Sequence, residues 1–547
     1  MRRIAGYALI VMCVVTFFVN NGVLLPDIME SRNIITAREM VYDGHWIVTT
    51  MNGELRLEKP PLPTWFAAIA EIAAPDSITA QRAMAGLAAL MLVFFFYRFA
   101  ERVLRVNAAV AVLLLCTCYN IILMGRTASW DIYCHAFMMG GIYYLSDALT
   151  RERRSWYRFA AAGVFIGLSL MSKGPVSLYA LFLPFIVCFA AFYRPSPRGK
   201  GWCLVLTTVI AIVVGTWWYA YIYLFHAEAL AHVVEKETGA WVGHNVRPWF
   251  YYWKFFLETG VWSALLLSAL LLPVFKSDCR RRQYIFSIAW TLLTLILLSC
   301  LPEKKSRYLL PMLIPASYVM ACLIEHWHTL LSESIGKACG EKWLFRANTW
   351  LITAAVIALP VAAYLYLYKS DAVSTVWLVG ATVAASAIAV WLIGASVRLK
   401  PYSMLVAVAV LFVAAEIFVL PHVGVLTVNQ ERKSIALTRN IEALKPLAFY
   451  HNDKDELRIE MVYAAHKNIR PLDLTDRETV MAALPCAVLT HGRVEEEMPA
   501  DILRDIHATY IDRYDDNRMP KGHRRYRDIF KYNVTILTRN DSYEQDK

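Results

Sequence analysis

The sequence predicts a mainly α-helical, polytopic membrane protein that carries a small C-terminal α/β domain. Of its 547 residues, 58% are hydrophobic and only 18% are charged, and the mean hydropathy is +0.42. Apolar runs such as "VLTTVIAIVVGTWWYAYIYLF" recur up to about residue 420, and about 20 apolar residues are enough to cross a bilayer. After that point, charged stretches alternate with short apolar runs, which is typical of a water-exposed domain.

The apolar runs predict about thirteen transmembrane helices. The first run follows Met1, Arg2 and Arg3 and resembles a signal peptide, but no small-residue cleavage site follows it, so we interpret it as an uncleaved span. Charges or clusters of Pro and Gly bound the others. The predicted spans are 4–24, 79–101, 106–124, 130–149, 157–171, 174–193, 202–225, 256–275, 284–301, 307–326, 348–368, 374–397 and 402–420.

The basic loops predict which side of the membrane each segment occupies. From a cytoplasmic N-terminus, this span count places the Arg- and Lys-rich segments on one side, namely 102–105, 151–158, 194–200, 276–282, 327–347 and 398–400. Such loops mark the cytoplasm. The loop 25–78, the loop 226–255 and the tail 421–547 are then predicted to be periplasmic, and we divide the chain into a membrane domain, 1–420, and a periplasmic α/β domain, 421–547.

Charge and cysteine content exclude some partners and sites. The net charge of +11 comes largely from the short loops, so membrane topology accounts for it and no nucleic-acid partner is predicted. Of the 11 cysteines, all but Cys486 lie in or next to apolar runs, where cysteine behaves as a small apolar residue. No disulfide framework or CxxC metal motif is present.

Several junctions on the predicted periplasmic side carry cations, against the topological bias. They include Lys59 in "EKPPLP", Arg126, Lys173 and the segment 304–307. A long cationic side chain can reach the interface from any single junction. Several basic groups at one membrane face, however, are what binding of a lipid phosphate requires.

Acidic groups on the same side have two interpretations. Asp27 and Glu30 follow the first span, and Asp131 opens the fourth. A carboxylate there could act as a general base, or could cap a helix or occupy its first turn. His244 lies alone before "NVRPWFYY", where it could be a structural hydrogen-bonding group or could hold a divalent metal with Glu58.

Two short helices and a small sheet are predicted outside the spans. The segments 31–44 and 62–74 are too short to cross a bilayer, and we expect helices that lie at the outer interface. In the tail, the runs 447–451, 486–491 and 533–539 are typical of strands. The tail has no glycine-rich phosphate loop or metal motif, which favours an accessory role over catalysis.

Five segments resemble the bacterial branch of the glycosyltransferase C superfamily, family 39 type, which includes protein O-mannosyltransferases and lipid A 4-amino-4-deoxy-L-arabinose transferases. They are "ESRNIITAREMVYDGHWIVTTMNGELRLEKPPLPTWF" (30–66), "RTASWDIY" (126–133), "MSKGP" (171–175), "HNVRPWFYY" (244–252) and "KKSRYLLPMLIP" (304–315). The first is the most specific. The resemblance covers the membrane region well and the tail only loosely.

The resemblance implies an inverting glycosyltransferase of the bacterial inner membrane with its site at the periplasmic face. The donor would be a sugar linked to undecaprenyl or another polyprenyl phosphate, the acceptor lipid A, and no organic cofactor is implied. Lys59 and Arg247 would bind the lipid phosphate, together with one of Lys304, Lys305 and Arg307. Glu58 and His244 would hold a Zn-like divalent metal, although "HNVRP" is one residue longer than in the relatives. Asp131 would be an active-site carboxylate, and Tyr308 matches a motif tyrosine.

One position departs from the family pattern, which has adjacent Asp and Glu after the first span. An ungapped alignment places Glu30 on the glutamate and Met29 on the aspartate, with Asp27 two residues earlier. Either Asp27 takes the first carboxylate role through a bulge, or Glu30 takes it.

Two other functions stay open at this point. A protein O-mannosyltransferase-like enzyme, or one that acts on another cell-surface glycan, would use the same donor chemistry. A lipid or solute transporter belongs to a different class. Transporters place polar groups near the middle of the membrane in broken helices, whereas the ionisable groups here gather near the predicted outer interface, which favours an enzyme.

Overall fold

The computed structural model describes residues 2–152, 155–243, 245–271, 281–333, 339–427, 429 and 431–540. The chain forms two compact units. The first comprises Met1–Val23 and Leu57–His422, and the second comprises Leu24–Arg56 and Val423–Lys547. Each unit is described by itself below.

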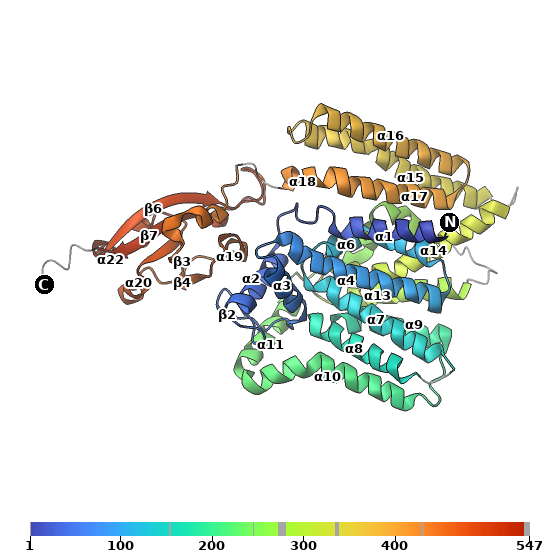
Figure 1. The fold of residues 1–547 in the computed structure, drawn as a ribbon, viewed down its shortest axis with the longest axis horizontal. Helices are drawn as coiled ribbons and strands as arrows, with labels where there is room; N and C mark the ends of the chain where they lie inside the picture. Colours follow the sequence, from blue (N-terminus) through green and yellow to red (C-terminus); the bar gives the residue numbers. More distant parts are fainter. Residues whose placement is uncertain are drawn as a thin grey trace. The chain divides into compact units, whose positions relative to one another are not determined.

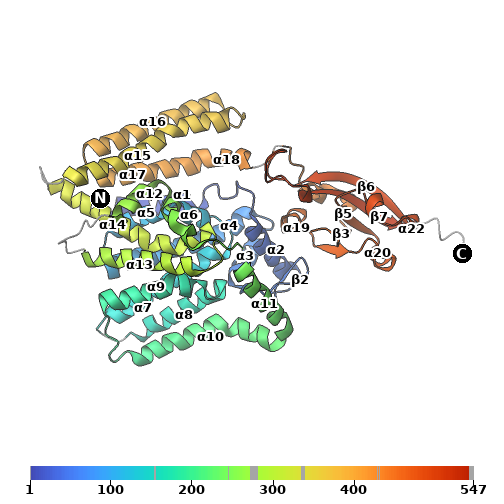
Figure 2. The ribbon, with the colours of Figure 1, turned by 180° about the vertical axis from the view of Figure 1, so that it is seen from behind.

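The first unit is a bundle of apolar helices (Figure 1). In chain order these are α1 (Arg2–Phe18), α3 (Leu62–Ala73), α4 (Ile78–Phe99), α5 (Ala108–Cys116), α6 (Tyr119–Gly125), α7 (Trp130–Thr150), α8 (Trp156–Lys173), α9 (Leu183–Tyr193), α10 (Gly201–Phe225), α11 (Ala227–Gly243), α12 (Ser263–Leu271), α13 (Arg281–Cys300), α14 (Leu310–Glu333), α15 (Cys339–Ala363), α16 (Thr375–Val397), α17 (Pro401–Ala414) and α18 (Leu420–Thr427). Helices α7, α8 and α10 lie side by side in that order in both views (Figures 1 and 2).

Many of these helices are long and apolar enough to cross a membrane. Within the described residues, 8 pass that test, and 9 if the bent pair α5 and α6 is one span. The chain is therefore a multi-pass membrane protein, while the count of thirteen stays a prediction. The predicted spans 130–149 and 157–171 form α7 and α8, which are helical but are not among the eight.

A break in one predicted span shapes the loop that leads to α7. The span 106–124 is divided into α5 and α6, which meet at 75°. The indole Nε1 of Trp262 donates a hydrogen bond of 2.7 Å to the Thr117 hydroxyl at the break. Just after α6, the Arg126 guanidinium donates to the carbonyls of Thr16 and Val19 at the end of α1. Since those carbonyls have no partner within the helix, Arg126 caps α1 and fixes the entry into α7.

The second unit is built on a five-stranded mixed sheet of order β4-β3-β5-β7-β6. Its strands are β3 (Ala448–Asn452), β4 (Ile469–Leu472), β5 (Cys486–Thr490), β6 (Ile506–Asp515) and β7 (Lys531–Arg539). Strand β3 is parallel to β4 and β5, while β7 is antiparallel to β5 and β6. The helices α19 (Ile459–Ala465) and α20 (Arg477–Ala483) connect the parallel strands, as parallel pairing requires. The three strand-like runs in the tail form β3, β5 and β7, whereas sequence analysis missed β4 and β6.

Residues 25–56 of the loop predicted at 25–78 belong to this second unit. Helix α2 (Ile28–Tyr42) packs against α19, and its Ile35 shares a buried core with Phe449 and Met461. The helix expected at 31–44 is present, but its charged residues Arg38 and Glu39 are both buried, at 6% and 4% exposure. The guanidinium of Arg38 donates a 3.1 Å hydrogen bond to the Tyr463 carbonyl, which satisfies part of its charge.

A short hairpin, β1 (Thr50–Met51) and β2 (Glu54–Leu55), completes the contact between this segment and the tail. Asn52 and Gly53 at its tip have φ of 60° and 80°, as type I′ turns require. The Asn52 side chain donates to the Ile469 carbonyl and accepts from the Ile469 amide, both at 2.7 Å. One amide side chain thereby pairs with β4, the edge strand, as a neighbouring strand would.

Candidate functional site

The sequence-predicted residues fall into both units, and the largest group lies in the first. Asp131, in the first turn of α7, forms an ion pair with Lys173, the last residue of α8. Their side chains are 3% and 8% exposed. Each charge also suits its helix end, because a helix N-terminus attracts anions and a C-terminus attracts cations. Predicted as a candidate carboxylate, Asp131 thus has a buried cationic partner.

A second part of this group comes from two loops that pair with each other. Val246 and Glu303 form an antiparallel bridge, and the Arg247 amide donates to the Pro302 carbonyl at 3.2 Å. The Tyr252 hydroxyl bonds to the backbone of Lys305 at 3.2 Å. The segment with Arg247 is therefore held directly beside the segment 302–308, as the predicted site requires.

Tyr308 lies at the centre of a group of cations. The ammonium groups of Lys173 and Lys305 lie 5.2 Å and 5.7 Å from the centroid of its ring, and the Arg307 guanidinium lies 5.7 Å from it. Arg307 also lies close enough to Asp131 to interact with it electrostatically. We call Asp131, Lys173, Lys305, Arg307 and Tyr308 the cation cluster.

One carboxylate ties part of this cluster to its loop. Glu303 forms an ion pair of 2.5 Å with Lys305 and accepts a hydrogen bond of 3.3 Å from the Tyr308 hydroxyl. The loop is also held by α6, since the amide of Asn120 donates a hydrogen bond to the Ser306 carbonyl at 3.1 Å. The cluster is thus prearranged by contacts from α6 and from its own loop.

Lys304 binds backbone carbonyls and is not part of this cluster. Its ammonium donates to the carbonyls of Arg247 and Leu301, and the residue is only 4% exposed. Burial lowers the pKa of this lysine. Within the predicted set, Lys304 therefore holds the two loops together, while Lys305 and Arg307 are the cations beside Tyr308.

Glu58 and Lys59 precede a helix that packs near the start of α7. Both are partly buried, and Pro61 is the N-cap of α3. One turn into that helix, the Phe66 ring stacks on Tyr133 at 5.5 Å between centroids, two residues after Asp131. The "EKPP" segment therefore leads into the part of the first unit that contains Asp131.

Asp27 and Glu30 lie in the second unit, at the start of α2. The Asp27 carboxylate accepts hydrogen bonds of 2.8 Å from the amides of Met29 and Glu30, and Glu30 accepts 3.1 Å from the Asp27 amide. This reciprocal arrangement is a capping box. The capping interpretation of these two carboxylates is confirmed, and their catalytic role stays a prediction.

Sequence analysis missed a cation from the tail that lies beside these carboxylates. The Arg518 guanidinium donates to the carbonyl of Pro26 and interacts electrostatically with Glu460, Asp27 and Glu30. Burial lowers the pKa of Arg518, against the opposing effect of these acids. No sequence motif marks this arginine, which is 491 positions from Asp27.

A second missed residue lies one turn beyond Asp131 on α7. His135 is 2% exposed, and its Nδ1 has no hydrogen-bond partner among the described residues. Oδ2 of Asp131, the oxygen that does not contact Lys173, is likewise buried without a hydrogen-bond partner among the described residues. Orphaned buried polar atoms are rare in folded proteins. The i, i+4 spacing of an acid and a histidine in "DIYCH" was the signal that could have identified His135.

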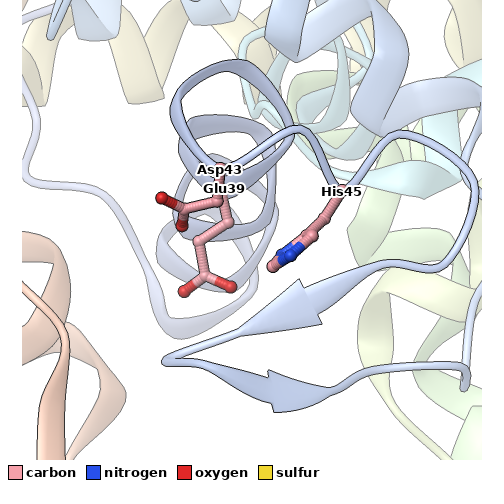
Figure 3. Close-up of side chains that lie close together, drawn as sticks. All are labelled: Glu39, Asp43 and His45. Atoms are coloured by element: carbon pink, nitrogen blue, oxygen red, sulfur yellow. The ribbon is translucent and has the colours of Figure 1, made fainter.

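The predicted metal pair is Glu58 and His244, and His244 lies outside the described residues. The metal role of this pair stays a prediction. Within the described residues, one other group has suitable ligands, Glu39, Asp43 and His45, whose ligand atoms all lie within 4.8 Å of one another. Figure 3 shows these three side chains gathered beside the hairpin of the second unit. Glu39 already accepts hydrogen bonds from Thr50 and Gly53, and burial raises its pKa.

Known proteins resemble this chain in sequence and in fold. Residues 58–219 match the family model described as dolichyl-phosphate-mannose-protein mannosyltransferase. An undecaprenyl phosphate-alpha-4-amino-4-deoxy-L-arabinose arabinosyl transferase of Shewanella sediminis is 26% identical over 54% of this chain and 55% of its own length. The corresponding transferase of Serratia proteamaculans is 24% identical over 58% of each chain. The chain thus spans somewhat more than half the length of these curated relatives.

One solved structure covers nearly the whole fold. The crystal structure of ArnT from Cupriavidus metallidurans bound to undecaprenyl phosphate has a TM-score of 0.65 and 15% sequence identity, and the match covers 96% of this chain and 97% of that one. The two proteins therefore share a fold. The resemblance that the sequence motifs indicate is confirmed by these comparisons.

Proposed function

We propose that this chain, in which residues 58–219 match the dolichyl-phosphate-mannose-protein mannosyltransferase family, is an inverting glycosyltransferase that uses a polyprenyl-phosphate-linked sugar. The proposed acceptor is lipid A, and the proposed sugar resembles aminoarabinose. The names of the curated relatives and the fold shared with the ArnT of Cupriavidus metallidurans support this assignment.

The cation cluster is the observation that carries the proposal. Lys173, Lys305 and Arg307 surround one tyrosine, beside the buried carboxylate of Asp131. Three cations at the ends of apolar helices can neutralise a phosphate that a lipid presents at that depth. Asp131 and Glu303 pair with Lys173 and Lys305, so three cations less two carboxylates leave one net positive charge at this position.

In the proposed reaction, the acceptor oxygen attacks the anomeric carbon of the donor sugar. The bond between that carbon and the phosphate oxygen breaks, and polyprenyl phosphate leaves with the electron pair. We assign Lys59, Arg247, Lys305 and Arg307 to stabilising the charge on this leaving group, and Asp131 to holding Lys173 among them. Lys304 supports the loops.

The need for a base depends on the acceptor. An acceptor phosphate is already ionised and gives up no proton, so the carboxylates would only position groups. If the acceptor is a hydroxyl, its proton must be removed, and Asp27 or Glu30 is our candidate for that base. A divalent metal at Glu58 and His244 stays part of the proposal, and no step above depends on it.

The description of the matched family favours a second candidate, a protein O-mannosyltransferase-like enzyme. It would use the same lipid-phosphate donor chemistry and the same cation cluster, and would differ in its acceptor. A transporter is disfavoured, because the clustered ionisable groups lie at helix ends, where Asp131 opens α7 and Lys173 ends α8.

We propose that the N-terminus is cytoplasmic, that the protein resides in the inner membrane, and that about thirteen spans place the cation cluster and the tail in the periplasm. The basic loops support this orientation. Arg151 is the C-cap of α7, at the end opposite to Asp131, and Arg158 in the first turn of α8 pairs with Asp147 near that end, as expected if Asp131 faces the periplasm.

Mass spectrometry of lipid A tests the proposal. Lipid A from cells that lack the gene should lose a species heavier by one sugar, and expression of the intact chain should restore it. Expression of a Lys59→Ala variant at the same membrane level should not. An unchanged lipid A profile in the deletion strain would exclude lipid A as the acceptor and would favour the O-mannosyltransferase-like alternative.

A further inference from the structure

The second unit contains a hollow that no step of the proposed reaction uses. It has a volume of about 420 Å³ and lies between the C-terminal half of α2, the start of β3 and the turn from α19 to β4. A smaller hollow of about 260 Å³ continues it, since the two share Phe449, His466 and Lys467. We call the two together the tail groove.

The charge of the tail groove is mainly positive. Among its described lining residues are five Arg and Lys side chains and two carboxylates, namely Arg38, Arg439, Lys445, Lys467 and Arg470 against Glu39 and Asp43. The carboxylate of Glu39 is already engaged, because it accepts hydrogen bonds from Thr50 and Gly53. An anionic ligand therefore suits the groove better than a cationic one.

Most of these cations are fixed in place by backbone carbonyls. The Lys467 ammonium donates to the carbonyls of Leu444, Lys445 and Leu447 at 2.6 to 2.9 Å. Arg439 donates to the carbonyls of Ala464 and Tyr463. The donors of these groups already form hydrogen bonds with the protein. Their contribution to the binding of a ligand would therefore be a positive electrostatic field rather than a direct hydrogen bond.

Two side chains that line the tail groove, Arg470 and Asn468, differ from these cations. The side chains of Arg470 and Asn468 make no hydrogen bond or ion pair with any part of the chain that the structure describes. Both lie beside the hairpin tip, because an added Cβ at Gly53 would lie 3.8 Å from Arg470 Nε and 3.8 Å from Asn468 Nδ2. A guanidinium and an amide that lie beside the same turn can both donate to one phosphate.

An aromatic side chain completes the lining. Tyr42 is 57% exposed on the α2 side. Tyr450 of β3 also lines the hollow, but it is partly buried against the cluster that contains Leu472 and Val488. The exposed ring of Tyr42 offers an apolar face and a polar tip, which matches the mixed surface of a sugar ring. Cations together with this tyrosine therefore fit a phosphate attached to a sugar better than a free inorganic phosphate.

We propose that the tail groove binds a phosphorylated saccharide, with its phosphate on Arg470 and Asn468 and its sugar ring against Tyr42. The identification of the saccharide as the headgroup of the acceptor rests on the proposed function, since a transferase that acts on a phosphorylated glycolipid must recognise that headgroup. The groove would give the tail a role in acceptor selection.

Binding to the full-length protein in detergent tests this proposal, with glucosamine 6-phosphate as the probe and calorimetry as the measurement. Arg470→Gln should weaken binding by about tenfold, because one charge-assisted contact is lost. Arg539→Gln is the matched control, an exposed strand arginine in the same sheet, and should bind as the wild type does. Arg470 has no partner to lose, so its variant should keep the wild-type melting temperature.

Two further arms make the result specific. Inorganic phosphate and N-acetylglucosamine should each bind more weakly than the sugar phosphate, and equal binding of inorganic phosphate would overturn the saccharide part. Lys59→Ala should leave probe binding unchanged. If the probe failed to bind Lys59→Ala but bound Arg470→Gln normally, it would lie at the donor site, and the proposal would be overturned. Normal probe binding without any sugar transfer would instead count against the proposed function alone.

Discussion

At the scale of single residues, the ion pair between Asp131 and Lys173 makes the most specific demand. Both partners are buried, and loss of one partner would leave the other charge unpaired in an apolar bundle. Asp131→Asn should therefore reduce the free energy of unfolding by about 3 kcal/mol and abolish transfer, because Lys173 loses its anchor beside Tyr308. Unfolding in mixed micelles and a transfer assay give the two readouts.

Asp147→Asn is the matched control for this prediction. Asp147 lies near the other end of α7, where it forms ion pairs with Arg151 and Arg158. Its loss should also lower stability and should leave transfer per folded molecule near the wild-type value. If Asp131→Asn retained wild-type transfer, the ion pair would be structural alone.

Arg518 carries the second prediction at this scale. Because it lies against the Asp27 and Glu30 carboxylates, Arg518→Ala should lower kcat by about tenfold or more with little change in KM for the donor. Arg518→Lys, which keeps the charge, should restore part of kcat. Arg525→Ala, at an exposed position in the same segment, serves as the control.

A merely structural arginine would give a different pattern from the one predicted for Arg518. Replacing such an arginine would lower the amount of folded protein and kcat equally, and the lysine variant would restore neither. Such a result would assign Arg518 to packing and would leave the two carboxylates as a helix cap.

These residues also show what could and could not be predicted from the sequence. Asp131, Lys305, Arg307 and Tyr308 were predicted, since each lies in a motif at a helix end, and the structure brings them together. The "DIME" stretch contained the capping-box spacing that the structure shows. The pairing of Asp131 with Lys173 over 42 positions depends on the packing of α7 on α8, which periodicity does not specify.

At the scale of elements, the hairpin β1–β2 depends on one side chain for its contact with the sheet. Asn52 makes both of its hydrogen bonds with Ile469 on the edge strand β4. Asn52→Ala should therefore destabilise the second unit by about 1–2 kcal/mol and should speed hydrogen exchange at the Ile469 amide. Asn440→Ala, at an exposed site whose side chain makes no hydrogen bond with the described residues, should change neither.

Unchanged exchange at Ile469 in the Asn52 variant would show that the hairpin is held by other contacts.

Strand β4, which the hairpin contacts, was missed in the sequence analysis for a physical reason. Strand β4 is short and contains Arg470 and Pro471 in its middle, which removes the apolar pattern of a strand. Its edge position tolerates the proline, and that position follows from the topology and not from the local sequence.

At the scale of the whole molecule, the chain does not divide at a single point. Residues 24–56 share the core of the tail, with Ile35 buried at 3% exposure in the same cluster as Phe449 and Tyr532. The boundary near residue 421 could be predicted from the change in composition, whereas this long-range grouping could not. The sequence predicted an interfacial helix at 31–44, because nothing in the local sequence indicates that the tail covers its polar side.

This grouping predicts the effect of a truncation. A chain that ends at residue 427 would leave Ile35 and its neighbours on α2 without a partner core. We expect protease cleavage within residues 24–56 and loss of transfer, while the apolar helices of the first unit still insert into membranes. Limited proteolysis with mass spectrometry locates the cuts, and wild-type transfer by the truncated chain would contradict this expectation.

The central claim is that basic groups of the first unit bind the phosphate of a lipid-linked sugar donor during transfer. Its most direct test is transfer by purified protein in proteoliposomes, with an undecaprenyl-phosphate-linked aminoarabinose and lipid A, and with mass spectrometry of the product. The wild type should form glycosylated lipid A, and Lys59→Ala should form none. The control Lys254→Ala, at an exposed lysine beside the Tyr251 ring, should retain activity. Undiminished transfer by a correctly inserted Lys59→Ala variant would contradict the claim.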